Sequence, residues 1–229
     1  ILAKSSRLVN FFGILKALLM LKYYFRGIKS QQMRTLIILF FLTNTIVIAQ
    51  ENISSELPFK SIPEDAKSYT AGNLLVRMIE GAGYRFYWAT EVLTSDDLKY
   101  KPSDSGQSIW ETVEHIYGLS DIIRNTSMNE VSIRPPADTP TDWAVLRMKT
   151  LRYLQDATKQ LKNKSPEELA ALEIIFERGG KQSTFPLWNM INGPISDIMY
   201  HSGQIVSFRR TNGNPLPKGV NVFTGRTKE

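Results

Sequence analysis

The sequence predicts an all-helical protein, a four-helix bundle, on three observations. Apolar residues recur at helical spacing in four stretches after residue 60. Each stretch opens on a helix-start motif and ends on a breaker. No glycine-rich phosphate loop, nucleophile elbow or internal repeat is visible. The composition, 42% apolar and 22% charged, is that of a globular chain with one domain and further segments.

The first two helices each begin at a predicted capping box. The first box is SIPE at 61–64, with Pro63 in the first turn, and its helix is expected to end near Thr94. A turn-rich connection at 95–102 follows. The second box is SIWE at 108–111, and its helix should run to about Asn125.

The third and fourth helices have equally clear ends. Residues 139–142 (TPTD) open the third helix, and 162–164 (KNK) stop it. Residues 165–168 cap a short helical piece that reaches Ile175, and 178–184 form a loop or the edge of a short hairpin. The last helix should run from near Pro186 toward Arg210. A kink is expected at Gly193-Pro194, because proline lacks the backbone N–H that continues a helix. The tail at 218–229 is expected to lie on the surface.

The N-terminal part is expected to lie outside the bundle. Met33-Arg34 precedes an apolar run that ends at Ala49, which is the pattern of a secretory signal peptide at 33–49. The predicted organisation is an upstream over-extension of the reading frame at 1–32, this signal, a linker at 50–60 and the bundle domain at 61–229. The mature protein is thus expected to be exported, periplasmic or extracellular. A retained membrane anchor, alone or as a two-helix anchor with 1–32, is the alternative.

Charge and cysteine content exclude several classes of function. Seven of the 28 basic residues lie in 1–49, which holds no acidic residue, so the rest of the chain carries 21 basic against 22 acidic residues. No basic footprint for nucleic acid is left in the folded part. The chain has no cysteine, which rules out disulfides, thiolate zinc sites and a cysteine nucleophile.

The only two histidines of the chain point to a metal site. His115 lies in the second predicted helix, and Asp197 and His201 lie four residues apart in the last, so the latter two share one helix face. Two imidazoles and a carboxylate are a ligand set for zinc, nickel, iron or manganese, and three ligands leave positions for water or substrate. The alternative is structural: a core histidine and a helix ion pair between Asp197 and His201.

A family resemblance strengthens the metal hypothesis. Residues 197–210 (DIMYHSGQIVSFRR) with GNP at 213–215 resemble the last-helix signature of the DinB-like superfamily. Residues 108–115 (SIWETVEH), preceded by LKYKP at 98–102, resemble its second helix. The likeness covers roughly 63–217. It implies a four-helix bundle with an unusual connection order, and a metal held by His115, Asp197 and His201. The commonest family pattern has His where Asp197 stands, which shifts metal preference toward harder ions.

The resemblance implies either metal-dependent hydrolysis or thiol-dependent transfer. Export argues against the thiol branch, so hydrolysis of a small-molecule substrate is expected, with a non-catalytic metal- or ligand-binding module as the alternative. A homodimer through a helix face is left open. Glu111 is a candidate base or a partner of His115, and Gln204 a candidate to orient an imidazole. Arg209 and Arg210 are expected to interact favourably with the negative C-terminal end of the helix dipole, and binding of an anionic substrate is the alternative. The candidate pocket-mouth residues are Tyr117, Trp188, Asn189, Asn192 and Tyr200.

Overall fold

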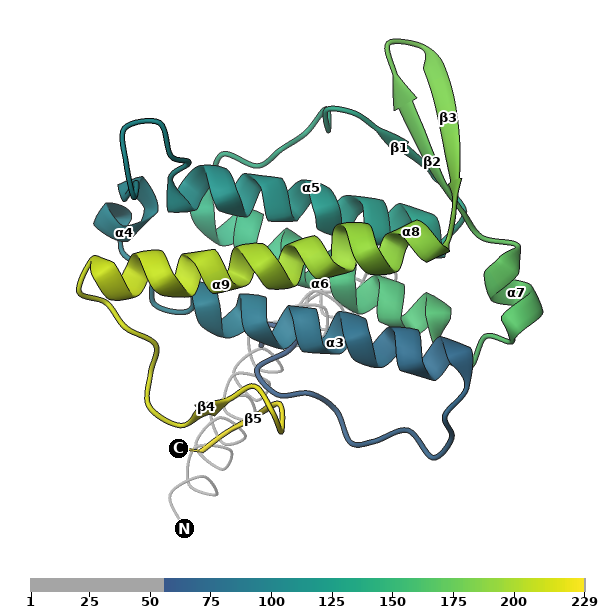
Figure 1. The fold of residues 1–229 in the computed structure, drawn as a ribbon, viewed down its shortest axis with the longest axis horizontal. Coiled ribbons are helices and arrows are strands. Elements are labelled where there is room, and N and C mark those ends of the chain that lie inside the picture. The colour runs from purple at the N-terminus through teal and green to yellow at the C-terminus, as the bar shows by residue number, and fades with distance from the viewer. Residues whose placement is uncertain (1–55, 229) are drawn as a thin grey trace, which may run out of the picture. The chain divides into compact units, whose positions relative to one another are not determined.

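The computed structural model describes residues 56–228, in which four long helices lie side by side (Figure 1). They are α3 (Ala71–Thr90), α5 (Ile109–Ser127), α6 (Trp143–Leu161) and α9 (Ser196–Thr211). Short helices α4 (Ser95–Lys99), α7 (Pro166–Ala170) and α8 (Trp188–Met190) lie in the connections. The predicted helical bundle is therefore present. The expected segments 1–32 and 33–49 and most of the linker lie outside the described residues.

The first helix begins later than predicted. Thr70 caps α3 by accepting a hydrogen bond from the backbone N–H of Asn73, whereas the expected box at 61–64 caps nothing. The reason is tertiary: the backbone N–H of Ile62 donates to the carbonyl of Gly225 in the C-terminal tail at 2.8 Å. The end of the expected linker also packs, since Phe59 is 6% exposed and lies in the hydrophobic core.

The start of α5 agrees with the sequence. The Ser108 hydroxyl accepts from the N–H of Glu111, and the Glu111 carboxylate accepts from the N–H of Ser108, so both halves of the capping box form. Asp142 caps α6, and a capping box at Ser165 opens α7. An unpredicted box, Thr94 with Asp97, opens α4 where only turns were expected.

A small sheet corrects the all-helical expectation. Strands β1 (Val131–Ile133), β2 (Glu173–Arg178) and β3 (Lys181–Pro186) pair in that order, β1 parallel and β3 antiparallel to β2. Helix was expected to reach Ile175, but this residue lies in β2. Isoleucine and phenylalanine at 174–176 favour a strand, and two positive-φ glycines turn the hairpin at Gly179 and Gly180. A second sheet in the tail pairs β4 (Val220–Asn221) with β5 (Arg226–Thr227).

The predicted kink precedes α9. Residues of α8 lead into η1 (Ile191–Ile195), a π-helical turn in which Gly193 leaves helical geometry at φ −93° and ψ −108°. Pro194 follows it and supplies no N–H, so the backbone ladder is interrupted there. The expected last helix is thus divided, and its second part, α9, carries Asp197 and His201.

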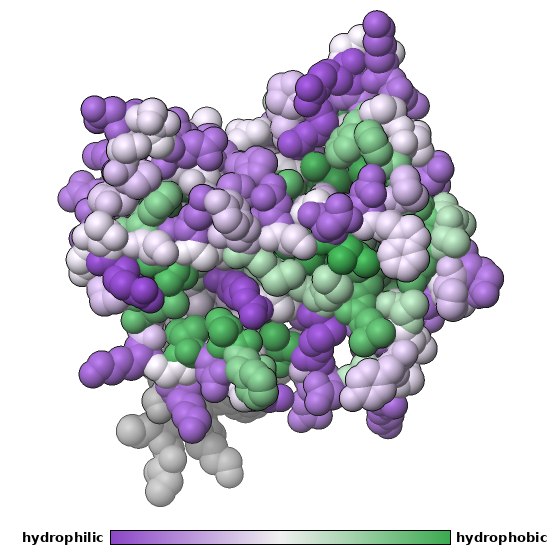
Figure 2. Space-filling model, viewed as in Figure 1, coloured by the Kyte–Doolittle hydropathy of each residue, from purple (hydrophilic) through white to green (hydrophobic). Residues whose placement is uncertain are grey.

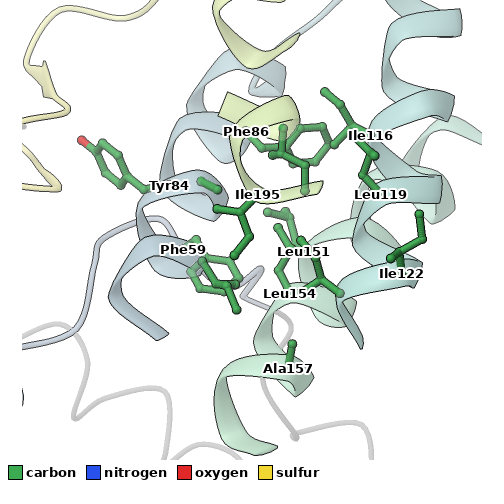
Figure 3. Close-up of a cluster of buried hydrophobic side chains, with 14 of the residues drawn as sticks. Phe59, Tyr84, Phe86, Ile116, Leu119, Ile122, Leu151, Leu154, Ala157 and Ile195 are labelled. Carbon is green, nitrogen blue, oxygen red and sulfur yellow. The ribbon is translucent and has the colours of Figure 1, made fainter. Parts of the chain in front are cut away.

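The core lies between the four long helices (Figure 3). Phe86 of α3, Ile116 of α5, Leu151 of α6 and Ile195 of η1 are completely buried and converge in this cluster. No helix among residues 56–228 has the length and apolar character needed to cross a bilayer.

Candidate metal centre

The candidate ligands come from two neighbouring helices, α5 and α9 (Figure 1). His115 stands in the second turn of α5. Asp197 lies in the first turn of α9, and His201 follows it one turn later. The two stretches that are 82 residues apart in sequence therefore meet through side chains.

The three side chains form a tight group. Nε2 of His115 lies 3.1 Å from Oδ2 of Asp197, and Nε2 of His201 lies 3.3 Å from Oδ1 of the same carboxylate. The two imidazole rings are 4.7 Å apart between centroids, at an interplanar angle of 82°. One ligand atom from each of the three residues lies within 4.8 Å of the other two.

This geometry fits a metal ion. Ligand atoms about 2.1 Å from a tetrahedral ion lie about 3.4 Å from one another. Each histidine lies near this distance from one oxygen of Asp197, His115 from Oδ2 and His201 from Oδ1, and one ligand atom of each residue lies within 4.8 Å of the other two. Imidazole nitrogen and carboxylate oxygen suit zinc, nickel, iron and manganese. The helix ion pair that the sequence left open is present too, but it does not account for His115, which arrives from the other helix.

The group opens to solvent on one side. The side chain of His201 is 13% exposed, whereas those of Asp197 and His115 are 40% and 41% exposed. His201 is thus mostly buried, whereas Asp197 and His115 border the solvent. A small molecule can reach this group without any opening of the bundle.

Gln204 orients His201. Its Oε1 lies 2.6 Å from Nδ1 of His201, and its Nε2 donates to the hydroxyl of Tyr200 at 3.3 Å. Partners of this kind fix the ring of a ligand histidine and the nitrogen that faces the metal. The sequence predicted Tyr200 only as a residue of the pocket mouth, and its contact with Gln204 was missed. Its spacing of four residues from Gln204 on one helix face was the available signal.

Glu111 serves its helix cap, and this argues against a role as base. Its Oε2 accepts from the N–H and the hydroxyl of Ser108 at 2.7 and 2.8 Å and lies 3.3 Å from Nζ of Lys101. These hydrogen bonds, helped by the charge of Lys101, lower the pKa of Glu111 to about 2. A carboxylate this acidic is a poor proton acceptor at neutral pH.

Two of the other predicted pocket residues, Tyr117 and Trp188, have surroundings of their own. Tyr117 is buried in the core, where its ring stacks on Tyr153. Trp188 is 75% exposed and borders an apolar cavity of about 460 Å³ between α3, α7 and α8. Apolar side chains are visible together around the α3–α8 end of the molecule in Figure 2. Within residues 56–228, no hydrogen bond joins Asn189 or Asn192 to the three ligands.

Arg209 does not face a substrate. The side chain is fully buried, and its Nη1 donates to the carbonyls of Trp88, Ala89 and Glu91 at 2.9–3.1 Å. These carbonyls are at the C-terminal end of α3, which has no helical partners for them. Arg209 therefore caps a different helix from its own, which neither reading of the sequence anticipated.

The comparisons with known proteins give fold-level likenesses. No protein-family model and no curated protein matches the chain. A DinB-like protein from Bacillus subtilis, YjoA, is similar in structure at a TM-score of 0.47 and 18% identity, over 63% of this chain and 96% of that one. YfiT from the same organism, described as a probable metal-dependent hydrolase with an unusual four-helix bundle topology, gives 0.45 and 14%, over 68% and 98%.

Proposed function

We propose that the protein binds one divalent metal ion through His115, Asp197 and His201 and acts as a metal-dependent hydrolase of a small molecule. The observation that carries the proposal is the convergence of three ligand atoms from α5 and α9 within 4.8 Å. The identity of the donors supports zinc, iron, nickel or manganese.

The arrangement of the group favours catalysis over a closed structural site. Three protein ligands leave coordination positions for water and substrate, as in catalytic zinc sites. A metal ion bound there supplies a Lewis acid and brings the pKa of a bound water toward neutrality. The chain's own contribution is to aim His201 through Gln204, to balance charge with Asp197, and to leave the outer side of the group open to solvent.

Elemental analysis of the purified protein tests the metal. We expect close to one equivalent of a divalent metal per chain, lost in His201→Ala and strongly reduced in Asp197→Asn. Asp138→Asn is the matched control, because Asp138 is exposed and forms an ion pair with Lys149 at 3.5 Å. A metal-free wild-type protein after growth and dialysis with each candidate metal would contradict the proposal.

A screen of ester, amide and phosphoester substrates tests the hydrolysis. We expect activity that a chelator removes and that the same metal restores. Full metal content without any hydrolysis would favour the alternative, a non-catalytic module that binds a metal or small ligand.

Export of the mature domain is part of the proposal and rests on the sequence at 33–49. Mass spectrometry of the protein from cell fractions should find a periplasmic or extracellular form that begins at Gln50. A membrane-bound form that retains 33–49 would support the anchor instead.

A further inference from the structure

We propose that Gln204 is a positioning residue that keeps the proton of the His201 imidazole on Nδ1, so that Nε2 is ready to bind metal. This inference rests on the proposed metal site. It goes further by assigning a proton state to each of the two histidines in the metal-free protein.

The contact between the two side chains carries the argument. Oε1 of Gln204 lies 2.6 Å from Nδ1 of His201, which is a short hydrogen bond. An amide oxygen only accepts, so the proton of this bond belongs to the imidazole. The other nitrogen, Nε2, faces Asp197 across the longer distance of 3.3 Å.

Tyr200 holds the amide in place. The Nε2 of Gln204 donates to the Tyr200 hydroxyl at 3.3 Å, which occupies the end of the amide that does not face His201. The tyrosine ring also packs edge-on against the imidazole, with centroids 5.2 Å apart at 73°. Turning the amide end for end would bring an NH₂ group to Nδ1 and favour the opposite tautomer. The Tyr200 hydroxyl can donate as well as accept, so it holds the amide in position, while the short contact between Oε1 and Nδ1 sets which end of the amide faces the imidazole.

His115 lacks such a partner. Its Nε2 lies 3.1 Å from Oδ2 of Asp197, and no hydrogen bond to its Nδ1 is recorded among residues 56–228. The carboxylate accepts only, so the neutral ring of His115 carries its proton on Nε2. The two histidines therefore hold opposite tautomers before metal binds. His201 is ready, whereas the proton of His115 must leave Nε2 before this nitrogen can serve as a ligand.

Nitrogen NMR of the imidazoles tests the inference without any enzyme assay. The full chain has only two histidines, so a long-range proton–nitrogen spectrum of the ¹⁵N-labelled, chelator-treated protein contains two ring systems. His115→Asn assigns them. In alkaline buffer, where imidazole is neutral, we expect His201 as the Nδ1–H tautomer and His115 as the Nε2–H tautomer.

Two substitutions of Gln204 separate proton placement from packing. Gln204→Glu keeps an acceptor opposite Nδ1 and should retain both the tautomer and the zinc affinity. Gln204→Met fills similar space without an acceptor and should shift His201 toward Nε2–H, with zinc binding weakened about 10- to 100-fold by calorimetry.

The results distinguish this inference from the metal proposal. An Nε2–H tautomer of His201 in the wild-type protein, or a Gln204→Met variant with unchanged tautomer and zinc affinity, would overturn the role of Gln204. The expected tautomers in a protein that binds no zinc would support that role and overturn the proposed metal function instead.

Discussion

Substituting Asp97 tests a buried polar junction that fixes the C-terminal end of α9. The carboxylate is 1% exposed and accepts four hydrogen bonds. The N–H and hydroxyl of Thr94 donate at 2.9 and 2.8 Å, and the side-chain amides of Asn212 and Asn214 donate at 2.9 and 2.7 Å. Asp97→Asn replaces one acceptor oxygen by a donor, which opposes donors that are already in place.

The size of the effect follows from the pKa. Burial alone would raise the pKa of Asp97, but the hydrogen bonds from Thr94, Asn212 and Asn214 outweigh burial and lower the pKa to about 2. The ordinary value is 3.8, and one unit corresponds to about 1.4 kcal/mol. The ionised form therefore contributes about 2 kcal/mol to the free energy of unfolding at neutral pH.

The pH dependence has a definite sign. Because the folded pKa is depressed, this stabilisation is complete above the unfolded pKa of about 4 and is lost as the pH falls through about 2. Urea unfolding followed by circular dichroism at pH 7 should show Asp97→Asn less stable by about 2 kcal/mol. The gap should narrow steadily between pH 4 and pH 2.

A neighbouring residue provides the control. Asp96 lies in the first turn of α4 but is exposed, and Asp96→Asn should change the free energy of unfolding by less than about 0.5 kcal/mol. A gap between wild type and Asp97→Asn that is as large at pH 2 as at pH 7 would refute the electrostatic reasoning, since it would then arise from packing alone.

Four further substitutions follow from the same structure. Arg209→Met should lower the free energy of unfolding by about 3 kcal/mol or more in urea, because three carbonyls lose a buried charged donor. Glu111→Gln should leave the metal content unchanged and lower the thermal midpoint, since its carboxylate serves the cap of α5. Gly72→Ala should destabilise by about 1–3 kcal/mol, because its Cβ would lie 2.6 Å from the carbonyl oxygen of Leu161. Gly203→Ala, a helical position with open space, should be neutral or stabilising by calorimetry.

The sequence predicted those features of the fold that depend on residues within one helical turn. The box at Ser108 fixed the start of α5, and the kink before α9 followed from Gly193-Pro194, because capping and the missing N–H of proline act within one helical turn. The spacing of Asp197 and His201 likewise determined that both face the same way.

The sequence could not predict features that depend on distant partners. The motif at 61–64 has a helix-start pattern, but Ile62 pairs with Gly225, more than 160 residues later. Strand β1 has only three residues and pairs with β2 over 40 positions away, too little local pattern to detect. Arg209 looked like an ordinary helix-end charge because the α3 carbonyls that it caps lie about 120 residues earlier.

The hydrogen bonds at the C-terminal end of α9 help to hold the ligand pair at its other end in place. Arg209 and Asn214 tie the end of α9 to the end of α3 and to Val92, which leaves the helix little freedom to slide along the bundle. A ligand pair on a helix serves only if its position is held to within a fraction of an ångström relative to the third ligand. His115 is fixed in turn by the capped start of α5. The buried arginine at one end of α9 thus acts on the candidate metal centre through the position of the helix, without touching it.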